Sequence, residues 1–172
     1  MTHQPQPALS AVWQRPFPAF TVERGEGVHL TTADGRRFLD FTSGIGVTNV
    51  GHCHPRVVRA IQEQAARVIH AQINLCLHRP VQQLMAGLQR LVPPRLDSFF
   101  FANSGAEAIE AALKLARQAT GKGHIIVFQG AFHGRTVAAT SLTSSKAAYR
   151  HGYQPLMAGV VTAPYPYAFR YG

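Results

Sequence analysis

The sequence predicts an α/β protein in which a small β meander precedes helices and part of a parallel sheet. Three observations support this fold class. Short β-like runs separated by glycine-containing turns occupy residues 20–41, and apolar positions at helical spacing follow between residues 54 and 92. A strand–turn–helix–strand order then begins at Asp97. That order is a βαβ unit, and such units pair their strands in parallel.

The N-terminal part is predicted to hold an extended arm and three short strands. Four prolines between positions 5 and 18 disfavour helix in residues 1–20. Strand-like runs are expected at residues 20–23, 28–32 and 37–41, because turn-forming residues separate them. We therefore assign residues 1–50 to an N-terminal arm and small β meander, and residues 51–172 to the first part of a larger domain.

Two helices are predicted in the middle of the chain. Pro55 suits the first helical position of one, and Pro80 opens the other. The apolar stripe of the first helix contains Val58, Ile61, Ala65 and Val68, and that of the second contains Val81, Leu84, Leu88 and Leu91. Stripes of this kind usually face a core, so we expect both to be buried.

The second half of the chain has the pattern of a parallel sheet. Two apolar runs, residues 98–102 and 124–128, are expected to be buried strands on either side of a helix over residues 106–120. On that helix we expect four side chains to face inward: Ile109, Ala112, Leu113 and Ala116. Gly121 ends the helix, and a third apolar run follows at Val160-Val161.

Composition argues against several classes of protein. The chain has 172 residues, of which 46% are hydrophobic and 15% charged, as in a globular domain with a core. No apolar run reaches the roughly 20 residues that span a bilayer. Cys53 and Cys76 make no disulfide framework, so we expect a cytoplasmic protein. The net charge is +9, yet the 17 basic residues are scattered singly, which disfavours nucleic-acid binding.

Two polar clusters follow the two predicted strands. Residues 103–107 lie where a helix begins, and the unpaired N–H groups there favour a phosphate, although the same residues also suit a plain helix cap. In residues 130–136, Phe132 could stack on a flat ring and Arg135 could pair with a carboxylate. Alternatively, Phe132 fills the core and Arg135 is solvated. Both clusters are expected at the ligand-binding edge of the sheet, beyond the carboxyl ends of its strands.

A third cluster, Gly51-His52-Cys53-His54-Pro55, contains possible metal ligands. Cys76 and His78 could be further ligands of the same ion. However, structural zinc sites show paired ligands in two well-formed sets, and that pattern is missing here. The residues favour roles in a turn and at the entry to a helix, so we predict no metal site.

These clusters, in this order and spacing, resemble the class III (ornithine/4-aminobutyrate type) pyridoxal-phosphate-dependent aminotransferases. The resemblance runs from about Phe20 to the end of the chain and is carried by Ser43-Gly44-Ile45-Gly46, by the third cluster, and by residues 103–110 and 132–136. It implies fold type I, of which this chain would hold part of the large-domain parallel sheet. It also implies a homodimer, pyridoxal 5'-phosphate as cofactor, and an amino acid and a 2-oxo acid as substrates.

The resemblance assigns cofactor-binding roles residue by residue. Gly105 and Ala106 would offer backbone N–H groups to the cofactor phosphate, with Ser104 beside them. Phe132 would stack on the pyridine ring, where many members have tyrosine, and His133 would line the same pocket.

The resemblance also implies two substrate-binding residues. Ile45 matches an isoleucine that lines the substrate mouth in the 4-aminobutyrate branch, and Arg135 matches an arginine that holds the substrate carboxylate. Together they suggest an ω-amino acid such as 4-aminobutyrate as the amino donor. An acetylornithine or ornithine aminotransferase remains an alternative, and so does a phosphate-ligand binding module without catalysis.

No catalytic residue of the family is matched in this chain. Transamination needs a Schiff-base lysine and an acid at the pyridine nitrogen. Lys114, Lys122 and Lys146 lie outside the family's Schiff-base context, and none of the eight acidic residues follows a later strand of the sheet. We therefore expect an N-terminal fragment of the enzyme that is inactive alone.

Overall fold

The computed structural model describes residues 20–172, so the arm predicted for residues 1–20 lies almost entirely outside the described residues. The chain divides into two compact units with the boundary between Arg79 and Pro80.

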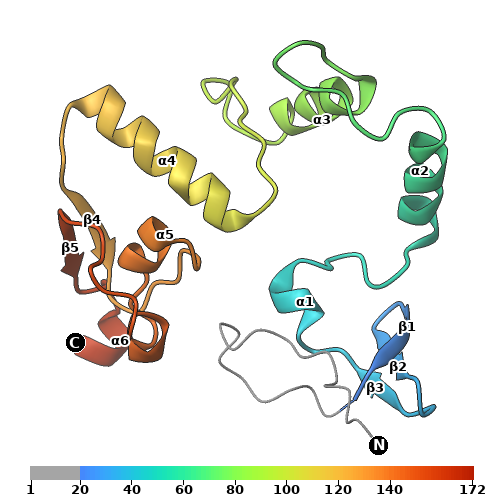
Figure 1. Cartoon of the computed structure of the whole chain (residues 1–172), viewed down its shortest axis with the longest axis horizontal. Helices are drawn as coiled ribbons and strands as arrows, with labels where there is room; N and C mark the ends of the chain where they lie inside the picture. Colours follow the sequence, from blue (N-terminus) through green and yellow to red (C-terminus); the bar gives the residue numbers. More distant parts are fainter. Residues whose placement is uncertain (1–19) are drawn as a thin grey trace, which may run out of the picture. The chain divides into compact units, whose positions relative to one another are not determined.

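The first unit contains an antiparallel three-stranded sheet. Its elements are β1 (Val22–Glu26), β2 (His29–Thr32), β3 (Arg37–Leu39), α1 (Ser43–Gly46) and α2 (Pro55–Ala65). The strands pair in the order β1-β2-β3, each antiparallel to the next (Figure 1), which confirms the predicted meander. Phe20 stacks on Phe38 with ring centroids 4.9 Å apart, and the Arg36 guanidinium lies over both rings. Aromatic packing on the sheet thus adds to the backbone ladder.

Helix α2 begins where the sequence predicts, but its apolar stripe is exposed. His54 caps the helix: its Nδ1 accepts a hydrogen bond of 3.3 Å from the Arg56 N–H, and Pro55 takes the first position. None of the residues of α2 is buried, and 63% of Ile61 is exposed. The expectation of a buried stripe is therefore wrong for this helix. A stripe becomes buried only against an opposing apolar surface, and no strand or helix in the described part of the first unit packs closely on α2.

The second unit holds the parallel strands. Its elements are α3 (Arg79–Gln89), which starts at the unit boundary, α4 (Gly105–Thr120), β4 (Ile125–Phe128), α5 (Val137–Leu142), a 3-10 turn η2 (Ala147–Tyr149), β5 (Val160–Ala163) and α6 (Ala168–Tyr171). The stripe of α3 is also not buried, since 48% of Leu84 and 82% of Leu91 are exposed. As for α2, no other described helix or strand of its unit packs closely on α3.

Strands β4 and β5 pair in parallel, with α5 in the connection between them (Figure 1). Their register runs from Ile125 opposite Val160 to Phe128 opposite Ala163. Parallel pairing is therefore confirmed, but not for the first predicted strand: residues 98–102 form no strand, and 75% of Phe100 is exposed. A strand needs a hydrogen-bonded neighbour, and among the described residues none pairs with this segment.

The core of the second unit lies between α4, β4 and α5. Its buried apolar side chains are Leu113, Val127, Ala139 and Leu142. Leu113 is buried as predicted. Ile109, Ala112 and Ala116 line one cavity together with it, so the four share a face, although Ala112 and Ala116 remain exposed. Helix α5 is short but carries four consecutive buried residues, so it anchors the loop that precedes it.

The end of α4 provides a test of the helix boundary. Gly121 follows the helix with φ of 66°, and its N–H donates to the Arg117 carbonyl. We expect Gly121→Ala to lower the free energy of unfolding by about 1 kcal/mol, because a Cβ disfavours the left-handed conformation. Gly123→Ala is the matched control, since Gly123 has open space around it and no positive φ. Urea denaturation of both variants measures the difference, and an equal effect of the two would contradict this account.

Candidate functional site

The first turn of α4 leaves backbone donors unused. The Ser104 hydroxyl caps the helix by accepting a 3.2 Å hydrogen bond from the Glu107 N–H. The Glu107 carboxylate in turn accepts from the backbone and side-chain N–H groups of Asn103, at 2.7 and 3.1 Å. Within the described residues the N–H groups of Gly105 and Ala106 have no acceptor. Two donors at the positive end of a 16-residue helix are therefore available to an anion.

The loop after β4 is fastened to the segment that follows α5. The backbone N–H of His133 donates to the Thr143 hydroxyl at 3.0 Å, and the N–H of Gly130 donates to the Ser144 hydroxyl at 2.9 Å. Thr143 is completely buried and donates its own proton to the Ala139 carbonyl at 2.9 Å. Because these partners are buried or half-buried, the loop has a defined path from Gly130 to Gly134.

Gly134 brings the loop against the start of α4. Its φ is +137°, and a Cβ at this position would come within 2.7 Å of the Ala106 Cβ and 3.0 Å of the Ala139 Cβ. The Thr136 hydroxyl also donates to the Glu110 carboxylate of α4. The structure therefore places two of the predicted cofactor-binding segments, residues 104–106 and 132–133, at one location. Their predicted roles remain predictions.

An aromatic side chain that the sequence analysis missed joins Phe132 to Arg135. The Tyr149 ring meets the Phe132 ring edge to face, with centroids 5.4 Å apart. The guanidinium carbon of Arg135 lies 4.9 Å from the Tyr149 ring centroid, and the Lys146 ammonium lies 5.8 Å from it. Phe132 is 55% exposed. No spacing rule links Tyr149 to Phe132, which lies 17 residues earlier, so only the folded chain reveals the contact.

His133 also lines a cavity of about 850 Å³ under α4. The cavity is bounded by the inward face of α4, by β4 and by aromatic side chains near the end of the chain, and its lining is mainly apolar. Among the predicted site residues only His133 reaches it. Ser104, Phe132 and Arg135 do not line it, so we place the candidate site at the junction of α4 with the loop rather than in this cavity.

In the first unit, Ile45 lies on an unusual turn. Ser43, Gly44, Ile45 and Gly46 have φ values of 48°, 61°, 64° and 80°. A β-branched residue rarely adopts this left-handed conformation, which costs of order 1–3 kcal/mol. The Ile45 side chain is also 93% exposed. The turn therefore presents an apolar side chain outward at a conformational cost.

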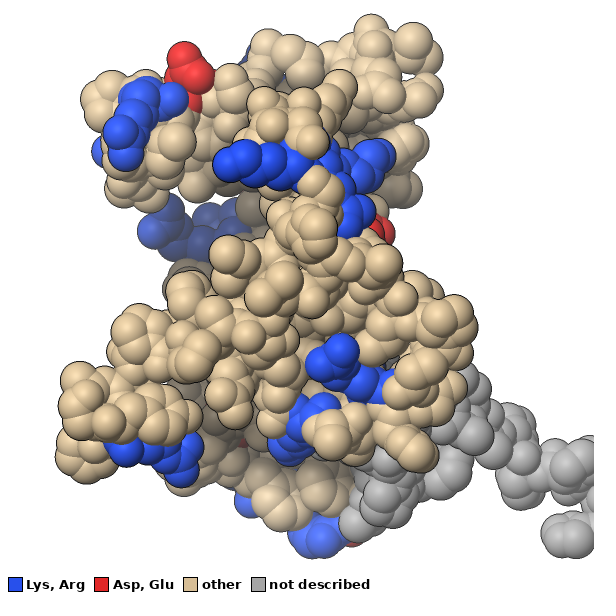
Figure 2. Space-filling view, turned by 90° about the vertical axis from the view of Figure 1, so that its left-hand side faces the viewer, with Lys and Arg blue, Asp and Glu red and all other residues tan. Residues whose placement is uncertain are grey.

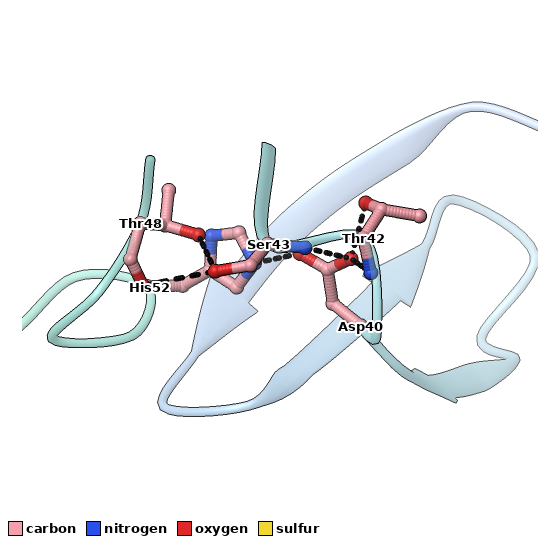
Figure 3. Close-up of polar contacts among 5 residues, drawn as sticks. All are labelled: Asp40, Thr42, Ser43, Thr48 and His52. Carbon is pink, nitrogen blue, oxygen red and sulfur yellow. Dashed lines mark hydrogen bonds and ion pairs between the residues drawn. The ribbon is translucent and has the colours of Figure 1, made fainter. Parts of the chain in front are cut away.

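A buried carboxylate holds the start of this turn (Figure 3). Asp40 Oδ1 accepts hydrogen bonds from the backbone N–H groups of Thr42 and Ser43, at 2.9 and 3.0 Å, and from the Thr42 hydroxyl. Asp40 Oδ2 lies 2.8 Å from His52 Nε2. The hydrogen bond from Thr42, followed by that of His52, lowers the pKa of Asp40 from 3.8 to about 2. Sequence patterns favour a turn for His52 and give no sign of Asp40, because no spacing rule links a carboxylate to a histidine 12 residues later.

The third sequence cluster shows the predicted entry to a helix. His54 and Pro55 start α2, and Cys53 and Cys76 are exposed free thiols. Within residues 20–172, no group of three or more His, Cys, Asp or Glu side chains is placed to hold a metal ion.

Two further observations concern the distribution of basic side chains and the length of the apolar helices. On the face drawn in Figure 2, Lys and Arg side chains occupy several separate places with uncharged surface between them. Over the described residues, none of the helices has the length and apolarity needed to cross a bilayer.

The chain is similar to known aminotransferases over nearly its whole length. The family model described as Aminotransferase class-III matches residues 9–171. A 2-aminoadipate transaminase of Pseudomonas putida is 46% identical over 149 residues, which are 86% of this chain and 36% of the relative. A probable 4-aminobutyrate aminotransferase of Bacillus subtilis is 40% identical over 148 residues, 86% of this chain and 34% of the relative. Acetylornithine aminotransferases are similar to it as well. The chain thus spans about a third of the length of the curated relatives it matches.

Solved structures agree in fold. An (S)-enantioselective omega-transaminase from Thermomicrobium roseum superposes with a TM-score of 0.83 at 32% identity. The match covers 99% of this chain and 39% of that one. The chain therefore has part of the fold of these transaminases, which is fold type I.

Gly134 allows a test of the junction between the loop and α4. We expect Gly134→Ala to lower the free energy of unfolding by about 1–3 kcal/mol beyond the effect of its positive φ, because the new Cβ overlaps Ala106 and Ala139. Gly130→Ala is the matched control: Gly130 also has a positive φ, of 83°, but has open space around it. Urea denaturation of the two variants separates the steric effect from the backbone effect, and equal losses would rule out the close contact.

The lowered pKa of Asp40 predicts a pH dependence. Because the folded-state pKa is about 2 and the ordinary value is 3.8, the stabilisation by the charged carboxylate is complete above the ordinary value and is lost as the pH falls through about 2. We expect the difference in free energy of unfolding between the wild type and Asp40→Asn to be smaller at about pH 3 than at about pH 6. Urea titrations at the two pH values measure it, and a difference independent of pH would contradict the assignment.

Proposed function

The chain belongs to the class III aminotransferase family, and on that premise we propose that it takes part in pyridoxal-phosphate-dependent transfer of an amino group from an amino donor to a 2-oxo acid. The observation that carries the proposal is the contact of Gly134 with Ala106. It brings the free helix N–H groups close to the loop that carries an exposed aromatic ring and an arginine, which supports a shared site. These are the groups that a phosphate, a flat cationic ring and a carboxylate require.

The residues present fit the cofactor. The unpaired N–H groups of Gly105 and Ala106 provide two donors for a phosphate at the N-terminus of α4. The Ser104 hydroxyl already accepts from Glu107 and retains its own proton as a third donor. Phe132 is about half exposed, and its loop is held by Thr143, so the ring has a free surface and a fixed attachment. His133 lies beside it in the same fixed loop.

The chemistry divides between the cofactor and the chain. Pyridoxal phosphate, when bound, supplies a conjugated ring that stabilises negative charge on the carbon next to the amino nitrogen. The residues of this chain bind and orient. Donors at α4 would hold the phosphate end, and Phe132 would stack on the ring. Arg135 would pair with a substrate carboxylate. We give Lys114, Lys122 and Lys146 no catalytic role.

We propose an ω-amino acid such as 4-aminobutyrate as the amino donor. Arg135 supports this choice, because its guanidinium is exposed and has an aromatic ring rather than a carboxylate as its neighbour, so it is available to a substrate anion. The exposed Ile45 is proposed to line the mouth through which the aliphatic part of the donor enters. The probable 4-aminobutyrate aminotransferase among the relatives supports the same class. Acetylornithine or ornithine as donor is the alternative, supported by the relatives of that name.

We further propose that the enzyme is a homodimer in the cytoplasm. The exposed apolar stripes of α2 and α3 support further protein contacts, since isolated apolar stripes of this length are usually covered.

The test of the function uses the protein expressed from its complete gene. Incubated with pyridoxal phosphate, it is expected to show the visible absorbance band of bound cofactor and to transfer nitrogen from 4-aminobutyrate to 2-oxoglutarate. N-acetylornithine and ornithine as donors test the alternative, and cofactor binding without turnover of any donor would favour a non-catalytic binding module.

Arg135→Leu separates carboxylate binding from the reaction. Losing a charge-assisted hydrogen bond of about 1.5–3 kcal/mol predicts a KM for 4-aminobutyrate that is roughly ten- to a hundredfold higher. An amine donor without a carboxylate is the control, and its KM is expected to stay unchanged. An equal rise for both donors would show that Arg135 does not read the carboxylate.

A further inference from the structure

The turn at residues 43–46 has a conformation that its own residues do not favour. Gly44 and Gly46 adopt positive φ values readily, but Ser43 and Ile45 do not, and both have positive φ. The turn has local hydrogen bonds, from the Ile45 N–H to the Thr42 carbonyl at 2.7 Å and from the Val47 N–H to the Ser43 carbonyl at 2.8 Å. No apolar side chain is buried by it, since Ile45 is 93% exposed. Contacts outside the turn must therefore determine its conformation.

Asp40 supplies those contacts. Its Oδ1 atom accepts from two consecutive backbone N–H groups, those of Thr42 and Ser43, at the point where the chain changes to positive φ (Figure 3). The carboxylate is only 5% exposed, so water competes little for these hydrogen bonds. The Ser43 hydroxyl also reaches across the turn to the Thr48 hydroxyl, 2.9 Å away, just beyond the end of the turn. The start of the turn is thus set by one carboxylate.

His52 in turn fixes the carboxylate. Its backbone is paired in both directions with Gly27, with N–O distances of 2.7 and 3.0 Å. Its side chain lies against Gly25, where an added Cβ would come within 2.8 Å of the His52 Cβ. The imidazole therefore has little freedom, and its Nε2 holds Asp40 Oδ2 at 2.8 Å. A chain of contacts runs from the sheet through His52 and Asp40 to the turn that carries Ile45.

We propose that Asp40 is a positioning residue for the amino donor, because it holds the left-handed turn that presents the Ile45 side chain. This inference rests on the proposed function, in which Ile45 lines the substrate mouth. Asp40 touches neither substrate nor cofactor in this scheme and acts through Ile45. Loss of Asp40 lets the turn relax to ordinary φ values, so that the Ile45 side chain is no longer held in the orientation that the turn gives it.

The experiment is a double-mutant cycle on the protein expressed from its complete gene. Asp40→Ala and Ile45→Ala are each expected to raise the KM for 4-aminobutyrate by about tenfold and to change kcat by less than about twofold, since uniform binding is lost. The double variant is expected to match Ile45→Ala alone, because Asp40 has nothing left to position. Multiplied effects in the double variant would show that Asp40 acts independently of Ile45 and would overturn the proposal.

A matched control is Asp34→Ala. Asp34 also accepts hydrogen bonds within a turn of the same sheet, from Thr32 and Arg36, but does not contact residues 43–46. The KM of the Asp34→Ala variant for 4-aminobutyrate is expected to equal that of the wild type. If Asp34→Ala and Asp40→Ala raise the KM equally, the effect is general destabilisation and the proposal fails.

A second measurement does not depend on activity or on a fully folded alanine variant. Hydrogen exchange of the Thr42 and Ser43 amides is expected to be about tenfold faster in Asp40→Asn, which keeps one acceptor oxygen, and unchanged in Asp34→Asn. Adding Ser43→Gly to the Asp40→Asn variant is expected to lower its KM for 4-aminobutyrate part of the way back to the wild-type value, since glycine tolerates the positive φ. Exchange that does not respond to Asp40→Asn would overturn the proposal. A wild type that shows the expected exchange but no transamination would instead reject the proposed function.

Discussion

At Gly134 the backbone of the loop after β4 passes so close to Ala106 and Ala139 that no side chain fits between them. This contact brings together the start of α4, the loop itself and the first turn of α5. Together with the hydrogen bond from Thr136 to Glu110, it holds the start of α4 beside the loop that carries Phe132 and Arg135. A side chain at position 134 would push the loop and the start of α4 apart, because closely packed atoms leave no free space there.

The loop keeps this position because buried polar groups hold it from the other side. Thr143 is completely buried, accepts from the His133 backbone and donates to Ala139, so its hydroxyl connects the loop to α5 with both of its roles satisfied. Asp40 has a similar part in the first unit, where one carboxylate organises a turn of unfavourable φ values. In each case a small buried polar side chain, rather than an apolar cluster, determines where an exposed residue lies.

Local chemistry was sufficient to predict the elements with strong local signals. Ser104 before a helix, Gly121 after it, and His54-Pro55 at the start of α2 all appear as expected, because capping hydrogen bonds and φ preferences involve only neighbouring residues. The predictions failed where an element depends on a partner. Residues 98–102 have the composition of a strand, and the stripes of α2 and α3 have helical spacing. Within residues 20–172, however, no strand pairs with the first segment and both stripes remain largely exposed. The composition of a segment does not specify the neighbouring strand or apolar surface that is needed to bury it.

The sequence by itself determined the family, the β meander, the helices α2, α3 and α4, and the residue types of the candidate site, since these follow from local patterns and from the spacing of three clusters. The tertiary structure alone decided that Gly134 touches Ala106, that Tyr149 meets both Phe132 and Arg135, and that Asp40 holds the turn of Ile45. Each of these contacts, apart from the last, joins residues far apart in the chain, and the last depends on His52 being held against Gly25. Distances across the fold depend on how all the elements pack at once, and no local pattern encodes them.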